Sequence, residues 1–265
     1  MKKKGIVSFD LDMTLLDHQS LQIPPSALKA LELLRENYYI VLATGRDMDA
    51  YYSRQYLDWV KPDGVIHLNG TKISVGDQVL HRHQMDSALL EQLLLFARQE
   101  GFCLGATVGD ADYYVHPEVL EFLETALWGE CGRQFQDPMK LLDIGVQTLA
   151  FFQMPDSEYD GIAAVEAAFP QLRLLPFAGK SGADVVEWSS SKAKGLERLC
   201  RHFDVKMENC YAFGDSMNDW EIIKAAGCGV AMGNAVEELK AVADYVTDPI
   251  DQNGIWNACR HLGLI

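Results

Sequence analysis

The stretch 5–18, GIVSFDLDMTLLDH, ends a short apolar run with Asp10 and places a second acid, Asp12, two residues later. The apolar run 5–9 contains β-branched residues and predicts a buried strand. Residues two apart on a strand point to the same face, and two like charges there repel each other. The pair is therefore either solvated at a surface turn, or it holds a cation and takes part in chemistry.

Strand and helix patterns alternate on both sides of the chain's middle. After the first strand, apolar residues recur at helical spacing in 26–37, and a strand pattern at 38–44 is followed by a helix pattern at 47–60 and a strand at 63–70. Such alternation is typical of a parallel sheet covered by helices. The pattern returns as helix, strand, helix, strand, helix and strand in the segments 191–203, 209–215, 217–226, 227–233, 235–243 and 244–248.

The middle of the chain has a different pattern, in which strands are joined by tight turns. Turn residues stand at Gly76–Asp77 and again at Gly109–Asp110, each between two strand-like runs. Strands joined by hairpins predict an antiparallel α+β unit inside the α/β fold. We place this insert at 83–184, which leaves 1–82 and 185–265 for the core domain.

Composition excludes several classes of protein. The 265 residues are 48% hydrophobic, enough for a packed core, and carry a net charge of −15. An acidic surface repels phosphate backbones, so nucleic-acid binding is not expected, and a site for an anionic substrate must be locally positive. The six cysteines have no CxxC spacing, and neither a signal peptide nor an apolar run of about 18 residues is present. We expect a soluble protein of the reducing cytoplasm that does not bind membranes.

Polar residues and glycines follow four of the predicted strands. Ligands of a parallel sheet collect beyond the carboxyl ends of its strands. One acidic strand end is commonly just solvated, but four polar ends that converge indicate a site. The residues are Asp10, Asp12 and Thr14; Thr44, Gly45 and Arg46; Asn69 and Gly70; and Gly214, Asp215, Asn218 and Asp219.

These residue types suit phosphoryl transfer. Asp10, Asp215 and the backbone carbonyl of Asp12 would supply hard oxygen ligands for Mg²⁺. The cation would remove the repulsion between the acids and let a carboxylate approach a phosphate. Asp10 would then attack phosphorus to form an aspartyl-phosphate, and Asp12 would protonate the leaving oxygen and later deprotonate water.

Four motifs resemble those of the haloacid dehalogenase superfamily, in its Cof-type sugar-phosphatase branch. The resemblance covers the whole chain, including the segments GVAMGNA (229–235) and ADYVTDPIDQNGI (243–255). The insert falls between the second and third motifs, where that branch carries its cap. The motifs are Asp10-Leu-Asp12-Met-Thr14, Thr44-Gly-Arg46, Lys192, and Gly214-Asp215-Ser-Met-Asn218-Asp219.

The resemblance implies a Rossmann-like, doubly wound core and a role for each motif residue. Asp10 is then the nucleophile and Asp12 the general acid/base, and both belong with Asp215 and Asp219 to the metal site. Thr44 and Lys192 hold phosphoryl oxygens, and Asn218 orients the phosphoryl group. Gly45, Arg46 and Asn69 complete the expected phosphate- and substrate-binding set, although Arg46 could instead cap a helix and Asn69 could belong to an ordinary turn.

The third motif offers two candidate lysines, and one position of the first motif departs from the family pattern. The third motif reads Lys, two residues, Gly or Ala, then an aliphatic residue, which Lys192 satisfies and Lys194 does not. Lys192 also stands at a helix start, where the dipole favours phosphate. The family often has glycine where this chain has Met13, which would be strained if that position required positive φ.

The sequence therefore predicts a Mg²⁺-dependent phosphatase of small phosphate monoesters, most simply sugar phosphates. Its partner would be a small phosphorylated metabolite, and the protein would be a monomer or weak homo-oligomer. Tyr113, Tyr114 and Trp128 of the insert could form a substrate-facing wall or pack in a core. A phosphomutase, and a non-catalytic protein that binds a phosphate ligand, are the alternatives.

Overall fold

The computed structural model describes residues 3–177 and 182–265, except for the side chains of Leu127 and Trp128. The chain divides into two compact units. The first comprises Met1–Met48, Ser53–Arg82 and Ser190–Ile265, and the second Asp49–Tyr52 and His83–Ser189.

The boundary between Arg82 and His83 coincides with the predicted one, whereas the second boundary lies between Ser189 and Ser190 instead of the predicted 184/185. Strand β11 (Gly182–Glu187) pairs with β9 (Leu149–Phe152) and β10 (Leu172–Pro176), so the second unit continues past residue 184. The short segment Asp49–Tyr52 also belongs to the second unit. There the Tyr52 ring lies 5.9 Å from the Arg133 guanidinium group.

The first unit is built on an eight-stranded sheet of order β14-β13-β12-β1-β2-β3-β4-β5. Neighbouring strands from β14 to β3 are parallel, and β4 and β5 add an antiparallel edge. The predicted α/β fold with a mostly parallel sheet is confirmed. The strands are β1 (Gly5–Phe9), β2 (Tyr38–Ala43), β3 (Gly64–His67), β4 (Lys72–Val75), β5 (Gln78–Arg82), β12 (Cys210–Gly214), β13 (Cys228–Ala231) and β14 (Tyr245–Val246).

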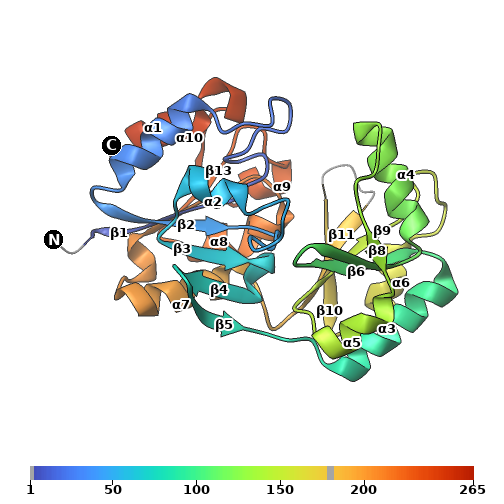
Figure 1. The fold of residues 1–265 in the computed structure, drawn as a ribbon. Helices are drawn as coiled ribbons and strands as arrows, with labels where there is room; N and C mark the ends of the chain where they lie inside the picture. The colour runs from blue at the N-terminus through green and yellow to red at the C-terminus, as the bar shows by residue number, and fades with distance from the viewer. Residues whose placement is uncertain (1–2, 178–181) are drawn as a thin grey trace. The chain divides into compact units, whose positions relative to one another are not determined.

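Helices cover both faces of this sheet. Helix α1 packs against α10 on one face and α7 lies on the other, as Figure 1 shows. The helices are α1 (Pro25–Leu34), α2 (Gln55–Val60), α7 (Lys192–Phe203), α8 (Trp220–Ala225), α9 (Glu237–Lys240) and α10 (Gly254–His261), with the 3₁₀ turns η1 (Leu68–Gly70), η3 (Met207–Asn209), η4 (Met217–Asp219) and η5 (Ile250–Gln252).

Strand β1 forms the centre of the core. All five of its residues are buried, because helices cover both faces of a central parallel strand. Its Phe9 ring stacks on Phe213 of β12, with ring centroids 4.8 Å apart. Burial of such side chains stabilises the fold by about 1.5–3 kcal/mol each. The strand that carries Asp10 at its end is therefore held firmly.

The second unit is α+β. Its six-stranded sheet has the order β10-β11-β9-β6-β7-β8, and all its pairs are antiparallel except β7 with β8. Helix α3 packs its leucines against the sheet in a core of its own. The remaining elements are β6 (Cys103–Val108), β7 (Ala111–Val115), β8 (Phe135–Gln136), α3 (Ser87–Glu100), α4 (Pro117–Trp128), η2 (Pro138–Lys140), α5 (Leu141–Ile144) and α6 (Gly161–Ala168).

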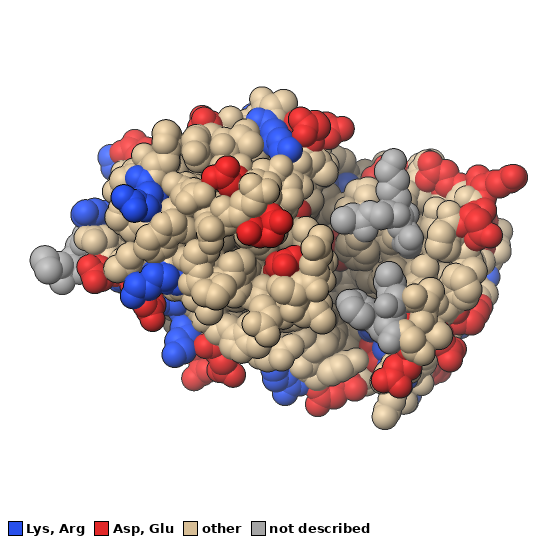
Figure 2. Space-filling model, turned by 90° about the horizontal axis from the view of Figure 1, so that it is seen from above, with Lys and Arg blue, Asp and Glu red and all other residues tan. Residues whose placement is uncertain are grey.

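The surface charge and the character of the helices both bear on which partners the protein can bind. On the face that Figure 2 shows, basic side chains of the described residues are interspersed with acidic ones. Among the residues that the structure describes, no helix combines the length and apolar character needed to cross a membrane.

Candidate active site

The carboxyl ends of β1, β2 and β12 meet at one edge of the first unit's sheet, because β1 lies between the other two and runs parallel to both. Asp10 follows β1 directly and donates its backbone N–H to the Phe213 carbonyl of β12 at 3.0 Å. Thr44 follows β2 and donates its N–H to the Ile66 carbonyl of β3 at 2.9 Å. The first two motifs are thus anchored to neighbouring strands.

Three carboxylates and one ammonium group gather at this edge, and we call them the Asp10 cluster. Carboxylate oxygens of Asp10, Asp215 and Asp219 lie within 4.8 Å of one another. Lys192 places Nζ 2.7 Å from Asp10 and 2.6 Å from Asp219. With three negative charges and one positive, the cluster has a formal charge of −2. Such an excess of negative charge away from water destabilises the fold unless a cation or added protons compensate it.

The pKa values of two members reflect this surplus. Burial raises the pKa of Asp10 to about 7, with a further raising effect from Asp219 and Asp12 and an opposing one from Lys192. Burial, followed by the charges of Asp10 and Asp219, also raises the pKa of Asp215 well above its usual value. A divalent cation would supply the missing positive charge, and carboxylate oxygens are the donors that hard cations prefer. The residues present therefore fit a candidate acidic metal site.

Asp219 is held on both of its oxygens. One accepts from Lys192, and the other accepts from the backbone N–H groups of Asp215 and Ser216 at 3.0 and 3.2 Å. Gly214 makes this approach possible, because a Cβ there would overlap the Asp219 carboxyl group. The arrangement fixes the turn that presents Asp215 beside Asp10.

Lys192 is the first residue of α7 and is fully buried, whereas Lys194 is partly exposed. The Ser191 side chain caps the helix by accepting from the Lys194 N–H at 3.3 Å. Burial opposes protonation of Lys192, but Asp10 and Asp219 outweigh it and raise its pKa. Of the two lysines weighed from the sequence, the structure brings Lys192 to the carboxylates.

Asp12 lies beside the cluster and is hydrogen-bonded to Arg46 and His18. Arg46 donates from Nε and Nη2 to its two carboxylate oxygens at 2.8 and 2.6 Å, and His18 Nε2 lies 2.7 Å from Oδ1. Burial would raise the pKa of Asp12, but hydrogen bonds from His18 and Arg46 outweigh burial and lower it. Asp12 is therefore an anion in this arrangement, and Arg46 is its partner rather than a helix cap.

Asn69 and Asn218, from the third and fourth strand ends, contact each other directly. Asn218 donates from Nδ2 to Asn69 Oδ1 at 3.2 Å, and its own Oδ1 accepts from Ser216 Oγ at 2.7 Å. Thr44 is fully buried, and its hydroxyl oxygen accepts the Arg46 N–H at 3.1 Å. Gly45 lies between these two residues and is half-buried.

Three supporting residues, Thr14, Asn234 and His18, had no individual role assigned in the sequence analysis. Thr14 donates its hydroxyl to Asp215 at 2.9 Å, and Asn234 donates to the Met13 carbonyl at 2.8 Å. His18 pairs with Asp12 as described. Thr14 and Asn234 lie inside the segments that resemble the family, so the sequence places them near the site. It does not predict which way their side chains point. Nothing in the sequence pattern pointed to His18.

Met13 has a φ of 59°, so this position does adopt the left-handed region. Its backbone explains why, because the Met13 N–H bonds to the Leu16 carbonyl at 2.8 Å in a tight turn. Left-handed backbone costs a residue with a Cβ about 1–2 kcal/mol. The strain anticipated for a methionine at this position is present.

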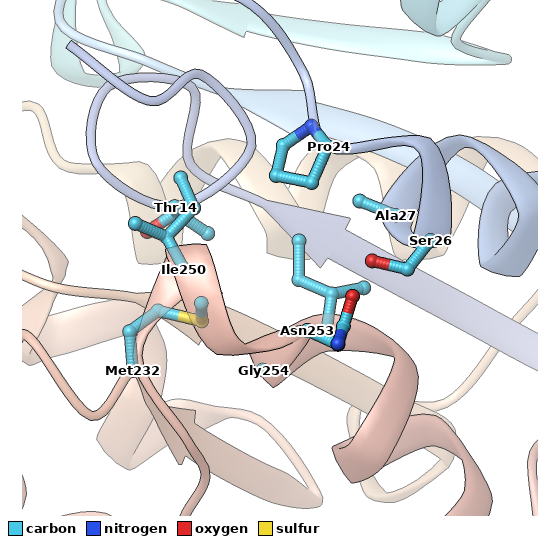
Figure 3. A pocket seen from close by; sticks show the side chains of 9 residues that line it. Thr14, Pro24, Ser26, Ala27, Met232, Ile250, Asn253 and Gly254 are labelled. Atoms are coloured by element: carbon cyan, nitrogen blue, oxygen red, sulfur yellow. The ribbon is translucent and has the colours of Figure 1, made fainter. Parts of the chain in front are cut away.

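A small pocket lies beside Thr14 (Figure 3). It has about 160 Å³ of empty space but no room for a water molecule. It is a packing gap and does not extend the site. Its lining is Thr14, Pro24, Ser26, Ala27, Met232, Ile250, Asn253, Gly254 and Ile255.

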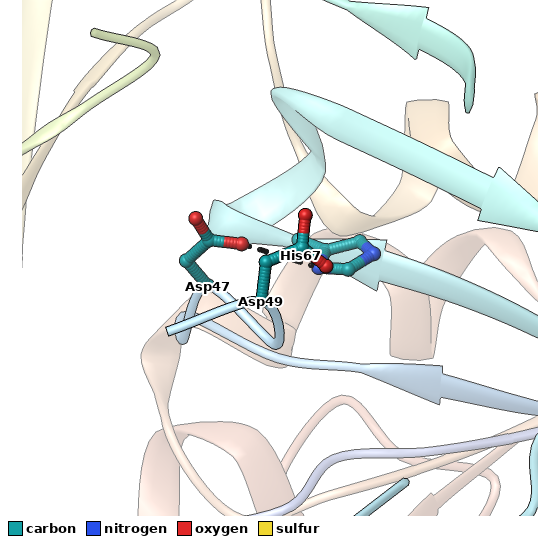
Figure 4. A group of neighbouring side chains, drawn as sticks. All are labelled: Asp47, Asp49 and His67. Carbon is teal, nitrogen blue, oxygen red and sulfur yellow. Dashed lines mark ion pairs between the residues drawn. The ribbon is translucent and has the colours of Figure 1, made fainter. Parts of the chain in front are cut away.

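A second charged group, the Asp47 cluster of Asp47, His67 and Lys72, lies at the ends of β2 and β3. Figure 4 shows Asp47 beside His67, with 3.6 Å between Oδ1 and Nδ1. That Nδ1 accepts the Met48 N–H at 3.2 Å, and Nε2 lies 2.8 Å from Ser74 Oγ. Lys72 pairs with Asp47 at 3.0 Å. Because the His67 lone pair is used and Lys72 offsets Asp47, this cluster fits a structural role better than a metal site.

The proposed aromatic wall is only partly described. Tyr114 is 4% exposed and packs in a core of the second unit with Cys103, Val119 and Leu120. Core packing is therefore the correct alternative for Tyr114. Tyr113 is half-buried, and the Trp128 side chain lies outside the described residues.

Comparison with known proteins identifies the family. A sequence model of haloacid dehalogenase-like hydrolases matches residues 7–259. The chain belongs to this hydrolase family. The family predicted from the four motifs is thereby confirmed.

Relatives of this hydrolase are named phosphatases. It is 31% identical to "Putative phosphatase YkrA" of Bacillus subtilis (strain 168), with 98% of each chain covered. It is 28% identical to the HMP-PP phosphatase of Enterobacter sp. (strain 638), over 91% of this chain and 88% of that one.

Solved structures give the same result. BT4131, a sugar phosphatase of subclass IIB of the superfamily, superimposes with a TM-score of 0.86 at 28% identity and covers 98% of this chain and 100% of its own. BT1666 from Bacteroides thetaiotaomicron, among the phosphatases of the superfamily, has the same TM-score and identity, with 100% and 96% covered. The chain is a phosphatase of this superfamily, as predicted.

Proposed function

We propose that this hydrolase releases phosphate from small phosphate monoesters of the sugar-phosphate type, with Mg²⁺ and through an aspartyl-phosphate at Asp10. The observation that carries the proposal is the Asp10 cluster, in which three carboxylates gather around one buried lysine that pairs with two of them, Asp10 and Asp219. The sugar phosphatase BT4131 and the HMP-PP phosphatase, which resemble this chain over most of its length, support a small phosphorylated metabolite as substrate. Action in the cytoplasm, as a monomer or weak homo-oligomer, is part of the same proposal.

Asp10, Asp215 and the Asp12 backbone carbonyl would hold the metal, with Asp219 in support. When bound, Mg²⁺ supplies positive charge that screens the carboxylates and the phosphate from each other. A cluster with a formal charge of −2 would thereby become neutral, which is the state in which a phosphate dianion can approach.

In the first step an Asp10 oxygen attacks phosphorus, and the bond from phosphorus to the ester oxygen breaks. Asp12 gives the leaving oxygen a proton. In the second step Asp12 takes a proton from water, whose oxygen attacks phosphorus and frees Asp10 and inorganic phosphate. Thr44, Lys192 and Asn218 hold the phosphoryl oxygens, and Gly45, Arg46 and Asn69 complete the substrate-binding set.

The ion pair between Arg46 and Asp12 adds a condition to this scheme. Asp12 must carry a proton in the first step, but Arg46 and His18 favour its anion. A substrate phosphate would offer Arg46 a second anionic partner and draw it away from Asp12. Arg46 would thus bind substrate and, by leaving Asp12, let this carboxylate take up from solvent the proton that it gives to the leaving oxygen.

A panel of phosphorylated metabolites tests the proposal. We expect the purified protein with MgCl₂ to release phosphate from sugar phosphates, without any bisphosphate activator. A chelator should abolish the release, and added Mg²⁺ should restore it. No release from any member of the panel with MgCl₂ would overturn the proposal, and release that depends on a bisphosphate would favour a phosphomutase.

Removal of the metal should also be visible without turnover. Because Mg²⁺ binds the folded cluster and relieves its repulsion, 100 Kd of free Mg²⁺ should stabilise the fold by about 2.7 kcal/mol. The measurement is thermal unfolding with MgCl₂ and with a chelator. Asp215→Asn is the control variant, in which the stabilisation should shrink, and an equal gain in both proteins would place the metal elsewhere.

A further inference from the structure

The turn Leu68–Gly70 has three successive residues in the left-handed region. Their φ values are 49° for Leu68, 53° for Asn69 and 93° for Gly70. This backbone disfavours a residue with a Cβ, yet two of the three are not glycine. Asn69 is also 1% exposed, so the turn is buried. Contacts with the surroundings must therefore hold it in place.

The contacts of this turn reach the second motif through backbone hydrogen bonds. The Asn69 N–H donates to the Thr44 carbonyl at 3.0 Å, and the Leu68 N–H donates to the Arg46 carbonyl at 3.2 Å. These bonds tie the loop after β2 to the end of β3. The Thr44 and Arg46 side chains are oriented from this loop.

The turn also touches the third and fourth motifs. A Cβ on Gly70 would overlap the Ser191 carbonyl and would lie 3.2 Å from the Lys192 nitrogen, so Gly70 sets how closely α7 can begin. Asn69 Oδ1 accepts from Asn218 Nδ2 at 3.2 Å. One three-residue turn thus meets the segments that carry Thr44, Lys192 and Asn218.

We propose that Asn69 and Gly70 are positioning residues, which set the spacing of the three groups that hold the phosphoryl oxygens. This inference rests on the proposed function. It refines the expected role of Asn69, whose carboxamide oxygen accepts from Asn218. Gly70 acts through its lack of a side chain, and Asn69 acts through its left-handed backbone and its acceptor oxygen.

Gly70→Ala tests the role of the close contact between Gly70 and the Ser191 carbonyl at the start of α7. Gly76→Ala is the matched control. Both glycines have positive φ, but a Cβ at Gly76 would meet nothing within 4 Å. Both variants therefore strain the backbone, and only Gly70→Ala displaces the start of α7. We expect Gly70→Ala to lower kcat on p-nitrophenyl phosphate by about ten- to hundredfold per folded molecule, since small misplacements cost this much.

The half-saturating Mg²⁺ concentration separates positioning from general damage. Gly70→Ala leaves Asp10 and Asp215 in place, so we expect this concentration to change less than twofold while kcat falls. Gly76→Ala should keep kcat within twofold. Equal kcat in the two variants, or a shift in Mg²⁺ requirement as large as the loss in kcat, would overturn the inference.

Asn69→Gly and Asn69→Asp provide a second test that does not depend on a clash. Glycine adopts the left-handed backbone but loses the acceptor for Asn218, and aspartate keeps both. We expect kcat to fall several-fold in Asn69→Gly and to recover in Asn69→Asp, whose added charge raises KM. Wild-type kcat in Asn69→Gly contradicts the proposed role.

Binding of inorganic phosphate, measured by calorimetry with MgCl₂, keeps the two proposals apart. We expect Gly70→Ala to bind phosphate at least about tenfold more weakly than Gly76→Ala. A wild-type protein that binds phosphate but hydrolyses no monoester would refute the proposed function alone. Active wild-type protein whose Gly70→Ala and Gly76→Ala variants bind phosphate equally would refute only the positioning role.

Discussion

The Asp10 cluster and the Asp47 cluster both bury charged side chains at strand ends of the same sheet, but they differ in charge balance. In the Asp47 cluster, Lys72 offsets Asp47, and both nitrogens of His67 have hydrogen-bonding neighbours. In the Asp10 cluster, one lysine faces three carboxylates, and the pKa of Asp10 is raised to about 7. Buried charge by itself therefore does not mark a site. The informative feature is a surplus of negative charge that the neighbouring side chains leave uncompensated, because a bound cation or added protons must then balance it.

Of all the substitutions considered, we expect one at Asp10 to have the largest effect on activity. Asp10→Asn removes the nucleophile and should lower kcat by at least about a thousandfold, in line with loss of a covalent catalyst. The fold should persist, because an amide replaces a carboxylate whose charge is disfavoured there. Phosphate release from a sugar phosphate and thermal unfolding measure the two expectations. Appreciable hydrolysis by Asp10→Asn would exclude Asp10 as nucleophile.

Substitution of the two buried lysines, Lys192 and Lys72, tests directly whether the two clusters differ in function. Lys192→Met should lower kcat by at least about a hundredfold, since it removes a charge that stabilises the transition state. Lys72→Met should leave kcat per folded molecule within twofold. Both should lose stability, about 3–5 kcal/mol for Lys192, because each leaves a carboxylate without its buried partner.

Urea unfolding and kcat, both measured on the folded fraction, separate these outcomes. If Lys72→Met loses as much kcat as Lys192→Met, the Asp47 cluster takes part in catalysis, and the distinction between the two clusters fails. If neither variant loses activity, Lys192 is structural as well.

Much of this arrangement was predictable, because it follows from periodicity and from strand ends. Apolar runs such as 5–9 and 38–44 identify buried strands, and parallel pairing then brings the residues after them together. Asp10, Asp215 and Lys192 could be predicted to meet for this reason. The lysine that the motif's fixed spacing favours over Lys194, Lys192, is the one that the structure brings to the carboxylates.

The parts that could not be predicted depend on tertiary contacts. The helix expected over 47–60 is present only in α2 (Gln55–Val60), because Asp47 and Met48 bond to His67 and Lys72 and the next four residues join the second unit. Helix α4 (Pro117–Trp128) was missed, although Pro117 stands at its first position. The pairing of Asp12 with Arg46 and His18 depends on side-chain directions within loops, which no periodicity encodes.

Met13 gives the smallest expected effect and tests whether the active-site turn is strained for function. Met13→Gly should relieve the left-handed backbone, and after the entropy that glycine adds to the unfolded chain we expect about 0.5 kcal/mol of added stability. Leu21, with a φ of 55° and half-exposed, is the matched control, and Leu21→Gly should gain a similar amount. Urea unfolding measures both. Because the Met13 N–H and carbonyl make the turn's contacts, kcat should stay within twofold; a larger loss with unchanged stability would mean that the methionine side chain itself holds Asp12 in place.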